Sequence, residues 1–261
     1  MGYYAIIKSN MYKGYNLKVN IEKDNVFWNF HNIGQKLFQD NLVKLGTTFK
    51  SFLEKDGTID GTKMQENWFP QYNFDVFISH SHADEDLAIF LSGWLSKHGI
   101  TSFVDSCLWG YSNKLLKEID NKYSWSETNK SVYAYYKVNY SSSHIHMMLS
   151  NALAMMIDKS ECFIFLNTPE SVVPFLEMDK TKSPWIYNEI VLSKLIEKKP
   201  PNRVRRTNET YSNFSGQEKL EIKYNLDLAH LTNLDYSMFF ETWGQKQFAS
   251  KNEALDSLYE L

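Results

Sequence analysis

From residue 74 onward, short apolar runs alternate with stretches in which apolar residues recur at helical spacing. Five-residue apolar runs of this kind are typical of strands buried in a parallel sheet, and helical spacing is typical of the helices that cover such a sheet. The predicted strands are 74–78, 100–104 and 162–166, and the predicted helices are 84–97, 143–159 and 185–197. The alternation predicts an α/β domain with a parallel sheet and functional residues at the carboxyl ends of its strands.

The first 72 residues follow a different pattern, and we expect them to form an N-terminal extension ahead of a domain at 73–261. Residues 3–7 are a short strand-like run, and 26–53 carry apolar residues at helical spacing. The apolar stripe consists of Phe27, Phe30, Ile33, Leu37, Leu42, Leu45, Phe49 and Phe52. We expect this stripe to pack on the domain or on another subunit.

Composition narrows the classes of partner. The formal net charge is -3, which gives no electrostatic reason to expect nucleic acid. No stretch approaches the roughly 20 apolar residues that cross a bilayer, and the start of the chain lacks the layout of a signal peptide. Cys107 and Cys162 are too few for a disulfide framework and have no zinc-ligand spacing. We therefore expect a cytoplasmic protein that binds neither nucleic acid nor membrane.

An ordered set of residues resembles the TIR (Toll/interleukin-1 receptor) domain family. The set runs from Asp75-Val-Phe-Ile-Ser-His-Ser81 and Ala83-Asp84, through Phe103-Val-Asp105 and Trp109, to Ser160 and Trp185-Ile-Tyr-Asn-Glu189-Ile190. The order of the set makes the resemblance specific, and it covers residues 75 to about 198. It implies a flavodoxin-like, doubly wound parallel sheet and a place in immunity, as in bacterial anti-phage defence of the Thoeris-like type.

The resemblance implies one of two activities. Many TIR domains cleave the bond between nicotinamide and ribose in NAD, which depletes NAD or yields an ADP-ribose-derived signal. In these enzymes a glutamate, often spaced Trp-x-x-x-Glu, stabilises an oxocarbenium-like centre. Other TIR domains are inactive modules that assemble with themselves or bind a partner effector. A homo-oligomer is implied in both cases, and NAD is a substrate in the first, so no cofactor is expected.

The catalytic position is the point at which this chain departs from the family pattern. Four residues after Trp109, where the family glutamate would stand, the chain has Asn113. The region between the second and third strands is long, with an insert expected at about 106–142 and two predicted helices, 113–123 and 143–159. Side chains of these helices are therefore candidates for catalysis: Glu118, Asp120, His144 and His146, with Glu127 in the insert as a weaker one.

Each of these candidates also has a structural interpretation. Glu118 and Asp120 could be solvated helix charges, and either histidine could satisfy the backbone of the insert. Because His144 and His146 lie two positions apart near a helix start, their side chains diverge, and we expect no metal site.

Polar residues follow the first two strands, at the edge where this architecture binds ligands. The candidates for contact with NAD are His80, Ser81, His82, Asp84, Asp105, Trp109 and Asn113. Residues 80–84 could instead cap the following helix, where Asp84 would suit the helix dipole. Trp109 could stack on nicotinamide or cover the loop. Trp185 and Glu189 match a structural signature of the family, and we expect them to pack and to stabilise their helix.

Overall fold

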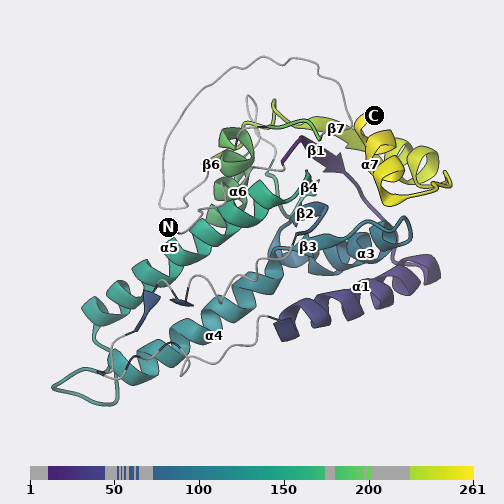
Figure 1. Cartoon of the computed structure of the whole chain (residues 1–261). Helices are drawn as coiled ribbons and strands as arrows, with labels where there is room; N and C mark the ends of the chain where they lie inside the picture. The colour runs from purple at the N-terminus through teal and green to yellow at the C-terminus, as the bar shows by residue number, and fades with distance from the viewer. Residues whose placement is uncertain are drawn as a thin grey trace, which may run out of the picture.

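The computed structural model describes residues 11–44, 52, 54, 56, 59–61, 63–64, 73–173, 180–196, 198–201 and 224–261. At its centre is a five-stranded sheet in the order β3-β2-β4-β1-β7, in which every neighbouring pair of strands is parallel. The strands are β1 (Lys13–Lys18), β2 (Val76–Ser79), β3 (Ser102–Val104), β4 (Cys162–Asn167) and β7 (Thr232–Asp235). The predicted α/β architecture with a parallel sheet is therefore confirmed (Figure 1).

Three predicted strands correspond to β2, β3 and β4. Their apolar residues are buried on both faces, as the continuous apolar runs indicate. The ring of Phe77 stacks on that of Phe163 with a centroid distance of 5.8 Å and lies 5.9 Å from that of Phe103. These contacts join the three strands through one aromatic layer.

Strand β1 comes from the segment that we expected to be an N-terminal extension. It lies between β4 and β7, and Tyr15 pairs with Ile164 on one side and Thr232 on the other. Its sequence alternates polar and apolar residues and has a buried asparagine, Asn16, at its centre. The sheet of the domain thus begins well before residue 73, whereas the strand-like run at 3–7 lies outside the described residues.

Asparagines on three adjacent strands explain how a polar residue is accommodated in the middle of β1. Asn167 Nδ2 donates to Asn16 Oδ1 at 2.9 Å, and Asn16 Nδ2 donates to Asn233 Oδ1 at 2.8 Å. This amide ladder crosses β4, β1 and β7 and satisfies the buried side chain of Asn16.

Helix α1 (Asn25–Lys44) packs against α3 (Glu85–Ser96) through two glycines, Gly34 and Gly93. A Cβ atom on Gly34 would lie 1.8 Å from the Ile89 carbonyl oxygen, so the two backbones are in direct contact. Beside this contact, the Phe27 and Phe90 rings stack at 4.7 Å.

The predicted apolar stripe therefore packs on the domain in the described residues. Phe27 and Phe52 are buried and Phe30 and Leu37 are partly buried, but Ile33 is 44% exposed. Leu45 and Phe49 lie outside the described residues, as does the side chain of Leu42.

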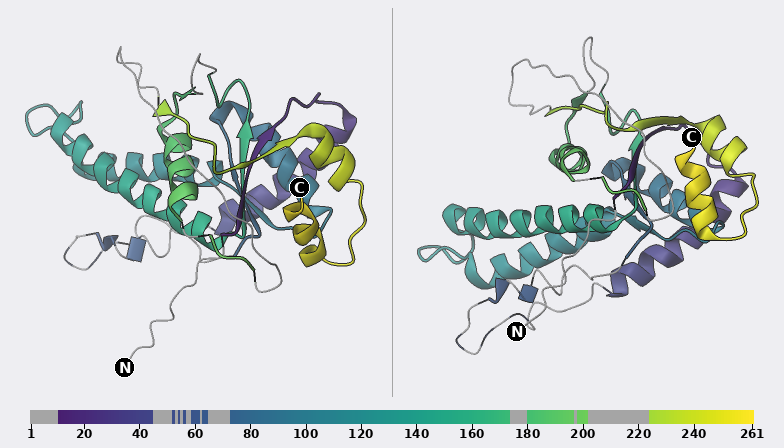
Figure 2. Two further views of the ribbon diagram at one scale, coloured as in Figure 1. Left: turned by 90° about the horizontal axis from the view of Figure 1, so that it is seen from above. Right: turned by 45° about the horizontal axis from the view of Figure 1, so that its top comes forward.

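The remaining helices complete two layers around the sheet, as Figure 2 shows. α5 (Tyr135–Lys159) and α6 (Pro184–Leu195) lie on one side, and α1 and α7 (Lys251–Tyr259) lie on the other. A π-helical segment, η3 (Ser237–Trp243), packs on α3 through Trp243 and Trp94, whose rings lie 5.5 Å apart. Two short strands, β5 (Lys180–Thr181) and β6 (Tyr224–Asn225), pair separately from the main sheet.

The expected insert at 106–142 is largely helical. α4 (Ser106–Tyr123) begins directly after β3, seven residues before the predicted start, and α5 begins at Tyr135 instead of 143. The two helices pack on each other as a long hairpin that projects from the sheet (Figure 1). In the part of the chain that the structure describes, no helix is both long and apolar enough to span a membrane.

Candidate active site

Four buried polar side chains meet at the carboxyl edge of the sheet. Ser79 ends β2 and His80 follows it, while Asp105 follows β3 and Glu189 projects from α6. Because Ile78 pairs with Val104, the ends of β2 and β3 lie side by side. All four side chains are 0% exposed, and we refer to them as the buried cluster.

Short contacts connect the members of the buried cluster. His80 Nδ1 lies 2.5 Å from Asp105 Oδ1, and Ser79 Oγ donates to Glu189 Oε2 at 2.5 Å. The carboxyl groups of Asp105 and Glu189 lie near enough for each to shift the pKa of the other, but both Asp105 oxygens and Glu189 Oε1 are buried without a hydrogen-bond partner among the described residues. The buried cluster therefore consists of two short contacts, one between Ser79 and Glu189 and one between His80 and Asp105, with the two carboxyl groups near each other.

Burial controls the protonation of this cluster. It raises the pKa of Glu189 well above its ordinary value, and the neighbouring charge of Asp105 raises it further. It also raises the pKa of Asp105 well above its ordinary value, although the nearby Glu189 side chain and the backbone amides of His80 and Ser106 oppose this rise. Burial lowers the pKa of His80 to about 4, so its imidazole is neutral at physiological pH.

The loop after β2 is tied to the loop after β4 by one carboxylate. Asp84 Oδ2 accepts hydrogen bonds from Ser81 Oγ at 2.5 Å and from Thr168 Oγ1 at 2.6 Å. Asp84 is the N-cap residue of α3 but makes no side-chain capping bond, which disfavours the capping interpretation. His82, in the 3-10 turn η2 (His82–Asp84), is exposed.

The predicted catalytic carboxylates of α4 lie away from this edge. Asp120 is 7% exposed and accepts hydrogen bonds from Ser124 Oγ and Ser141 Oγ, both at 2.6 Å, so it joins α4 to α5. Fifteen residues of helix separate it from Asp105, which corresponds to about 22 Å. Glu118 and Asn113 are exposed on the same helix.

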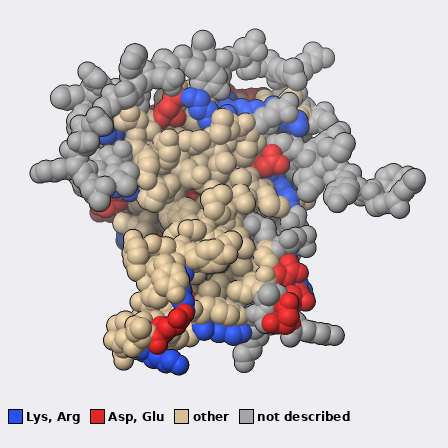
Figure 3. Space-filling model, turned by 90° about the vertical axis from the view of Figure 1, so that its left-hand side faces the viewer, with Lys and Arg blue, Asp and Glu red and all other residues tan. Residues whose placement is uncertain are grey.

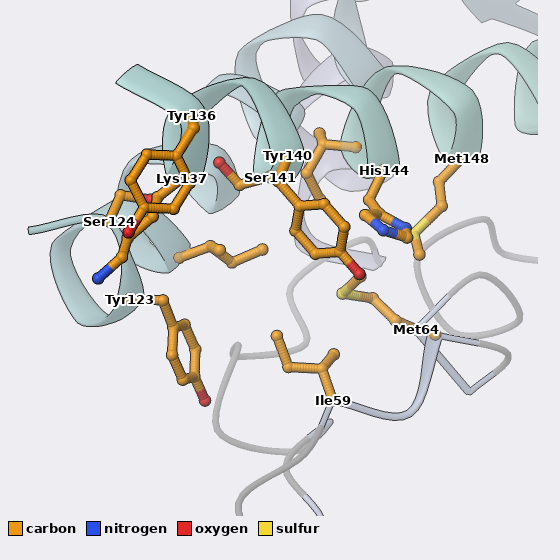
Figure 4. A pocket seen from close by; sticks show the side chains of 13 residues that line it. Ile59, Met64, Tyr123, Ser124, Tyr136, Lys137, Tyr140, Ser141, His144 and Met148 are labelled. Atoms are coloured by element: carbon orange, nitrogen blue, oxygen red, sulfur yellow. The ribbon is translucent and has the colours of Figure 1, made fainter. Parts of the chain in front are cut away.

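The two predicted histidines of α5 are separated from the buried cluster and from each other. The His146 ring makes an edge contact with Trp185 at 5.6 Å, and the His144 ring makes one with Tyr140 at 4.6 Å. His144 lines a cavity between the hairpin and Ile59, Gly61 and Met64 (Figure 4). Neither histidine touches a carboxylate of the cluster through any contact among the described residues.

The cavity has a volume of about 830 Å³ and an apolar lining. Its walls are Ile59, Gly61, Met64, Ile119, Tyr123, Ser124, Tyr136, Lys137, Tyr140, Ser141, His144, Ile145 and Met148. Ser124 and Ser141 direct their hydroxyl groups to Asp120, and Lys137 Nζ lies 3.2 Å from the Trp125 carbonyl oxygen. A dinucleotide brings a pyrophosphate that needs several hydrogen-bond donors or cations. The cavity therefore suits an apolar ligand better than NAD.

Sequence reasoning assigned Glu189 a structural role, and the structure places it beside Asp105 and His80. The sequence does contain a signal for this role, because Trp185 and Glu189 have the Trp-x-x-x-Glu spacing, and both residues lie on α6. Of the predicted NAD contacts, His80 and Asp105 belong to the buried cluster, and Ser81 and Asp84 lie beside it. The side chain of Trp109 lies outside the described residues.

Comparisons with protein-family models, with curated proteins and with solved structures found no match. The resemblance to TIR domains therefore stands on the residues of the chain itself. Among the described residues, no group of three or more His, Cys, Asp or Glu side chains could hold a metal ion.

Proposed function

We propose that the protein is a TIR-type enzyme that cleaves NAD at the nicotinamide-ribose bond, with Glu189 as the essential carboxylate. The observation that carries this proposal is the position of Glu189, which is buried at the carboxyl edge of a parallel sheet beside Asp105 and His80. The Trp-x-x-x-Glu spacing supports the same residue, and the TIR resemblance supplies NAD as the substrate.

The chemistry requires a carboxylate next to the ribose. The C1′–N1 bond breaks and its electron pair goes to the nicotinamide nitrogen, which is cationic before cleavage and neutral afterwards. Positive charge builds up on the ribose, and an ionised carboxylate stabilises it. Burial raises the pKa of Glu189 well above its ordinary value, and a cationic substrate at this site would lower that pKa and favour the ionised form.

Substrate access requires the edge of the sheet to open, because Glu189 is 0% exposed. The hydrogen bond from Thr168 to Asp84 joins the loops after β4 and β2 at this edge. We propose that NAD enters where these two loops separate. The product is ADP-ribose or a derivative, in the anti-phage setting that the resemblance implies.

The test is chromatographic separation of the products that purified protein forms from NAD. We expect nicotinamide release by the wild type and a loss of about 100-fold or more in Glu189→Gln, since removing one transition-state contact costs roughly 10² to 10³ in rate. Glu118→Gln is the matched control, because Glu118 is an exposed glutamate on α4. Equal loss in both variants, or loss only in Glu118→Gln, would reject the assignment of Glu189.

A second candidate function is assembly with other copies or with a partner effector, and one surface favours it. The hairpin exposes large side chains, among them Tyr135 at 82%, Tyr136 at 65% and Tyr140 at 71%. Figure 3 shows this side of the molecule with few charged residues in its middle. Exposed aromatic residues on a surface with few charges are typical of protein interfaces. Sedimentation of the wild type against Tyr135→Ser and Tyr136→Ser tests this candidate, which predicts a smaller species in the variants.

A further inference from the structure

A stripe of four side chains runs along one face of α5 and lines the cavity at the hairpin. Tyr136, Tyr140, His144 and Met148 are spaced four positions apart, so they lie one above another on the helix. The apolar side chains that line the cavity from other segments are Ile119 of α4 and, on the opposite wall, Ile59 and Met64 (Figure 4).

The size and shape of the cavity match those of a small-molecule site. Its volume of about 830 Å³ falls within the roughly 300 to 1,000 Å³ of such sites. A Cβ atom on Gly61 would lie 3.3 Å from Met148 Cε, so this methionine reaches the opposite wall. Met64 is 2% exposed, whereas Tyr136 and Tyr140 are largely exposed. The cavity therefore has a closed apolar wall at Met64 and an opening beside the two tyrosines.

Hydrogen bonds across the hairpin hold two walls of the cavity in place. Asp120 Oδ1 accepts from Ser124 Oγ and from Ser141 Oγ, both at 2.6 Å, which ties the end of α4 to α5. Both serines line the cavity, and both direct their hydroxyl hydrogens to Asp120 instead of into it. Because these walls are fixed before a ligand arrives, binding loses less conformational entropy.

The charges around the cavity favour an uncharged ligand. Lys137 is the only lysine or arginine among the described residues that line it. Its Nζ lies 3.2 Å from the Trp125 carbonyl oxygen and 3.4 Å from Glu127 Oε1, so the Glu127 carboxylate offsets its charge. An anionic ligand would lose its hydration without gaining an unpaired cation, which is costly.

Tyr140 and His144 can recognise one polar group on such a ligand. Their rings lie 4.6 Å apart, and Figure 4 shows both side chains on the cavity side of α5. Among the described residues, neither the Tyr140 hydroxyl nor the His144 ring donates or accepts a hydrogen bond within the chain. A phenol and a neutral imidazole each offer one donor and one acceptor, so they suit a hydroxyl, carbonyl or amine group.

We propose that this cavity binds a neutral, mostly apolar small molecule whose single hydrogen-bonding group lies at Tyr140 and His144. The apolar body of the ligand packs against Ile59, Ile119 and Met64. A peptide fits less well, because each of its backbone N–H and C=O groups would need a partner that the lining does not supply. Asp120 beside the cavity is about 22 Å along α4 from Asp105, so the site is separate from the buried cluster and does not depend on NAD cleavage.

The test uses two fluorescent probes that share one ring system. N-phenyl-1-naphthylamine is neutral and carries one N–H group, and 8-anilinonaphthalene-1-sulfonate adds an anionic sulfonate to the same rings. Titration of each probe into the full chain should give saturable binding of one neutral probe per chain. The sulfonate should bind about tenfold or more weakly, because burying its charge has no compensating partner.

Two neighbouring methionines provide a variant and its matched control. Met148→Trp fills the cavity and should weaken binding of the neutral probe by about tenfold or more, since overpacking costs roughly 1 to 3 kcal/mol. Met147→Trp makes the same change at a residue that is 63% exposed and outside the lining, and it should leave binding unchanged.

Two further variants test the opposite wall and the polar end. Ile59→Glu places a charge on the wall facing the hairpin and serves if Met148→Trp does not fold. It should also weaken the neutral probe by about tenfold or more. The double change Tyr140→Phe and His144→Phe removes both hydrogen-bonding groups and should weaken the probe by about 2- to 10-fold. Unchanged affinity in the double variant would overturn the role of these two residues.

Three other results would overturn the site itself. Equal affinities in Met148→Trp and Met147→Trp would place the probe elsewhere, and tighter binding of the sulfonate would reject a neutral ligand. One probe per two chains, with affinity that falls on dilution of the protein, would mean that a second copy completes the site and would favour the hairpin as an assembly surface. Nicotinamide release is not part of the readout, so these results leave the proposed function untouched.

Discussion

The contact between α1 and α3 allows a stability prediction with an internal control. Gly93 faces α1, and a Cβ atom placed on it would lie 1.9 Å from the Phe30 carbonyl oxygen and 2.7 Å from the Gly34 nitrogen. Real Cβ atoms essentially never approach other atoms closer than 3.0 Å. Gly93→Ala must therefore displace α1 from α3 by about 1 Å, because backbone cannot rotate away as a side chain can.

The loss of stability in Gly93→Ala follows from the gap that this displacement opens between α1 and α3. A gap of 0.5 to 1 Å forfeits about a quarter to a half of the dispersion attraction between the facing atoms, and here these include the stacked rings of Phe27 and Phe90. Overpacking of a core costs roughly 1 to 3 kcal/mol. Because alanine is more favourable than glycine inside a helix, the substitution also stabilises α3 by about 1 kcal/mol. We therefore expect a net loss of up to about 2 kcal/mol in the free energy of unfolding.

The assay is urea unfolding followed by circular dichroism, with Gly110→Ala as the control. Gly110 lies in α4, and an added Cβ would meet nothing within 4 Å, so this variant should be as stable as the wild type or up to about 1 kcal/mol more stable. If Gly93→Ala is as stable as Gly110→Ala, α1 does not pack on α3 as described.

Three further predictions concern a buried histidine, the hairpin and the edge of the sheet. Burial lowers the pKa of His230 to about 4, below the 6.5 of the unfolded chain, so the stability it contributes is present above pH 6.5 and is lost as pH falls toward 4. Urea titrations at pH 7 and 4.5 should show that the free energy of unfolding is lower at pH 4.5 by up to about 3 kcal/mol, at about 1.4 kcal/mol per pH unit. The same difference should be smaller in His230→Gln. Asp120→Ala should lower stability by about 2 kcal/mol, because two buried hydroxyl groups lose their acceptor, while nicotinamide release stays at the wild-type rate. A loss of turnover without a loss of stability would restore Asp120 as a catalytic candidate. Thr168→Val should speed amide hydrogen exchange in the loop after β2, because it removes one donor to Asp84, and unchanged exchange would show that this bond does not hold the edge closed.

The parts of the fold that could be predicted are those in which apolar runs are continuous. β2, β3 and β4 are buried on both faces. Their continuous apolar sequences predict this burial even when the neighbouring strands and helices are not known. β1 could not be recognised in the same way, because Asn16 interrupts its apolar pattern and is hydrogen-bonded by Asn167 and Asn233, which are distant in sequence. No local pattern reveals a hydrogen bond between residues that the fold brings together.

The candidate site was predictable on the strands and not on the helices. His80 and Asp105 follow directly from β2 and β3, so the rule that ligands bind at the carboxyl edge was enough to find them. Asp120 was a candidate because it is a carboxylate on the helix that follows the second predicted strand, near the expected catalytic position, but this helix places it about 22 Å from Asp105 along the hairpin. Glu189 enters the site from α6, far along the chain, and only the packing of that helix shows that its side chain reaches Ser79 and Asp105.

The measurement that tests the central claim most directly is the rate of nicotinamide release from NAD by wild-type protein and by Glu189→Gln at equal, high protein concentration. The account predicts release by the wild type and a rate lower by about 100-fold or more in the variant, with both proteins folded and equally soluble. Release at the same rate by the two proteins would contradict the role assigned to Glu189.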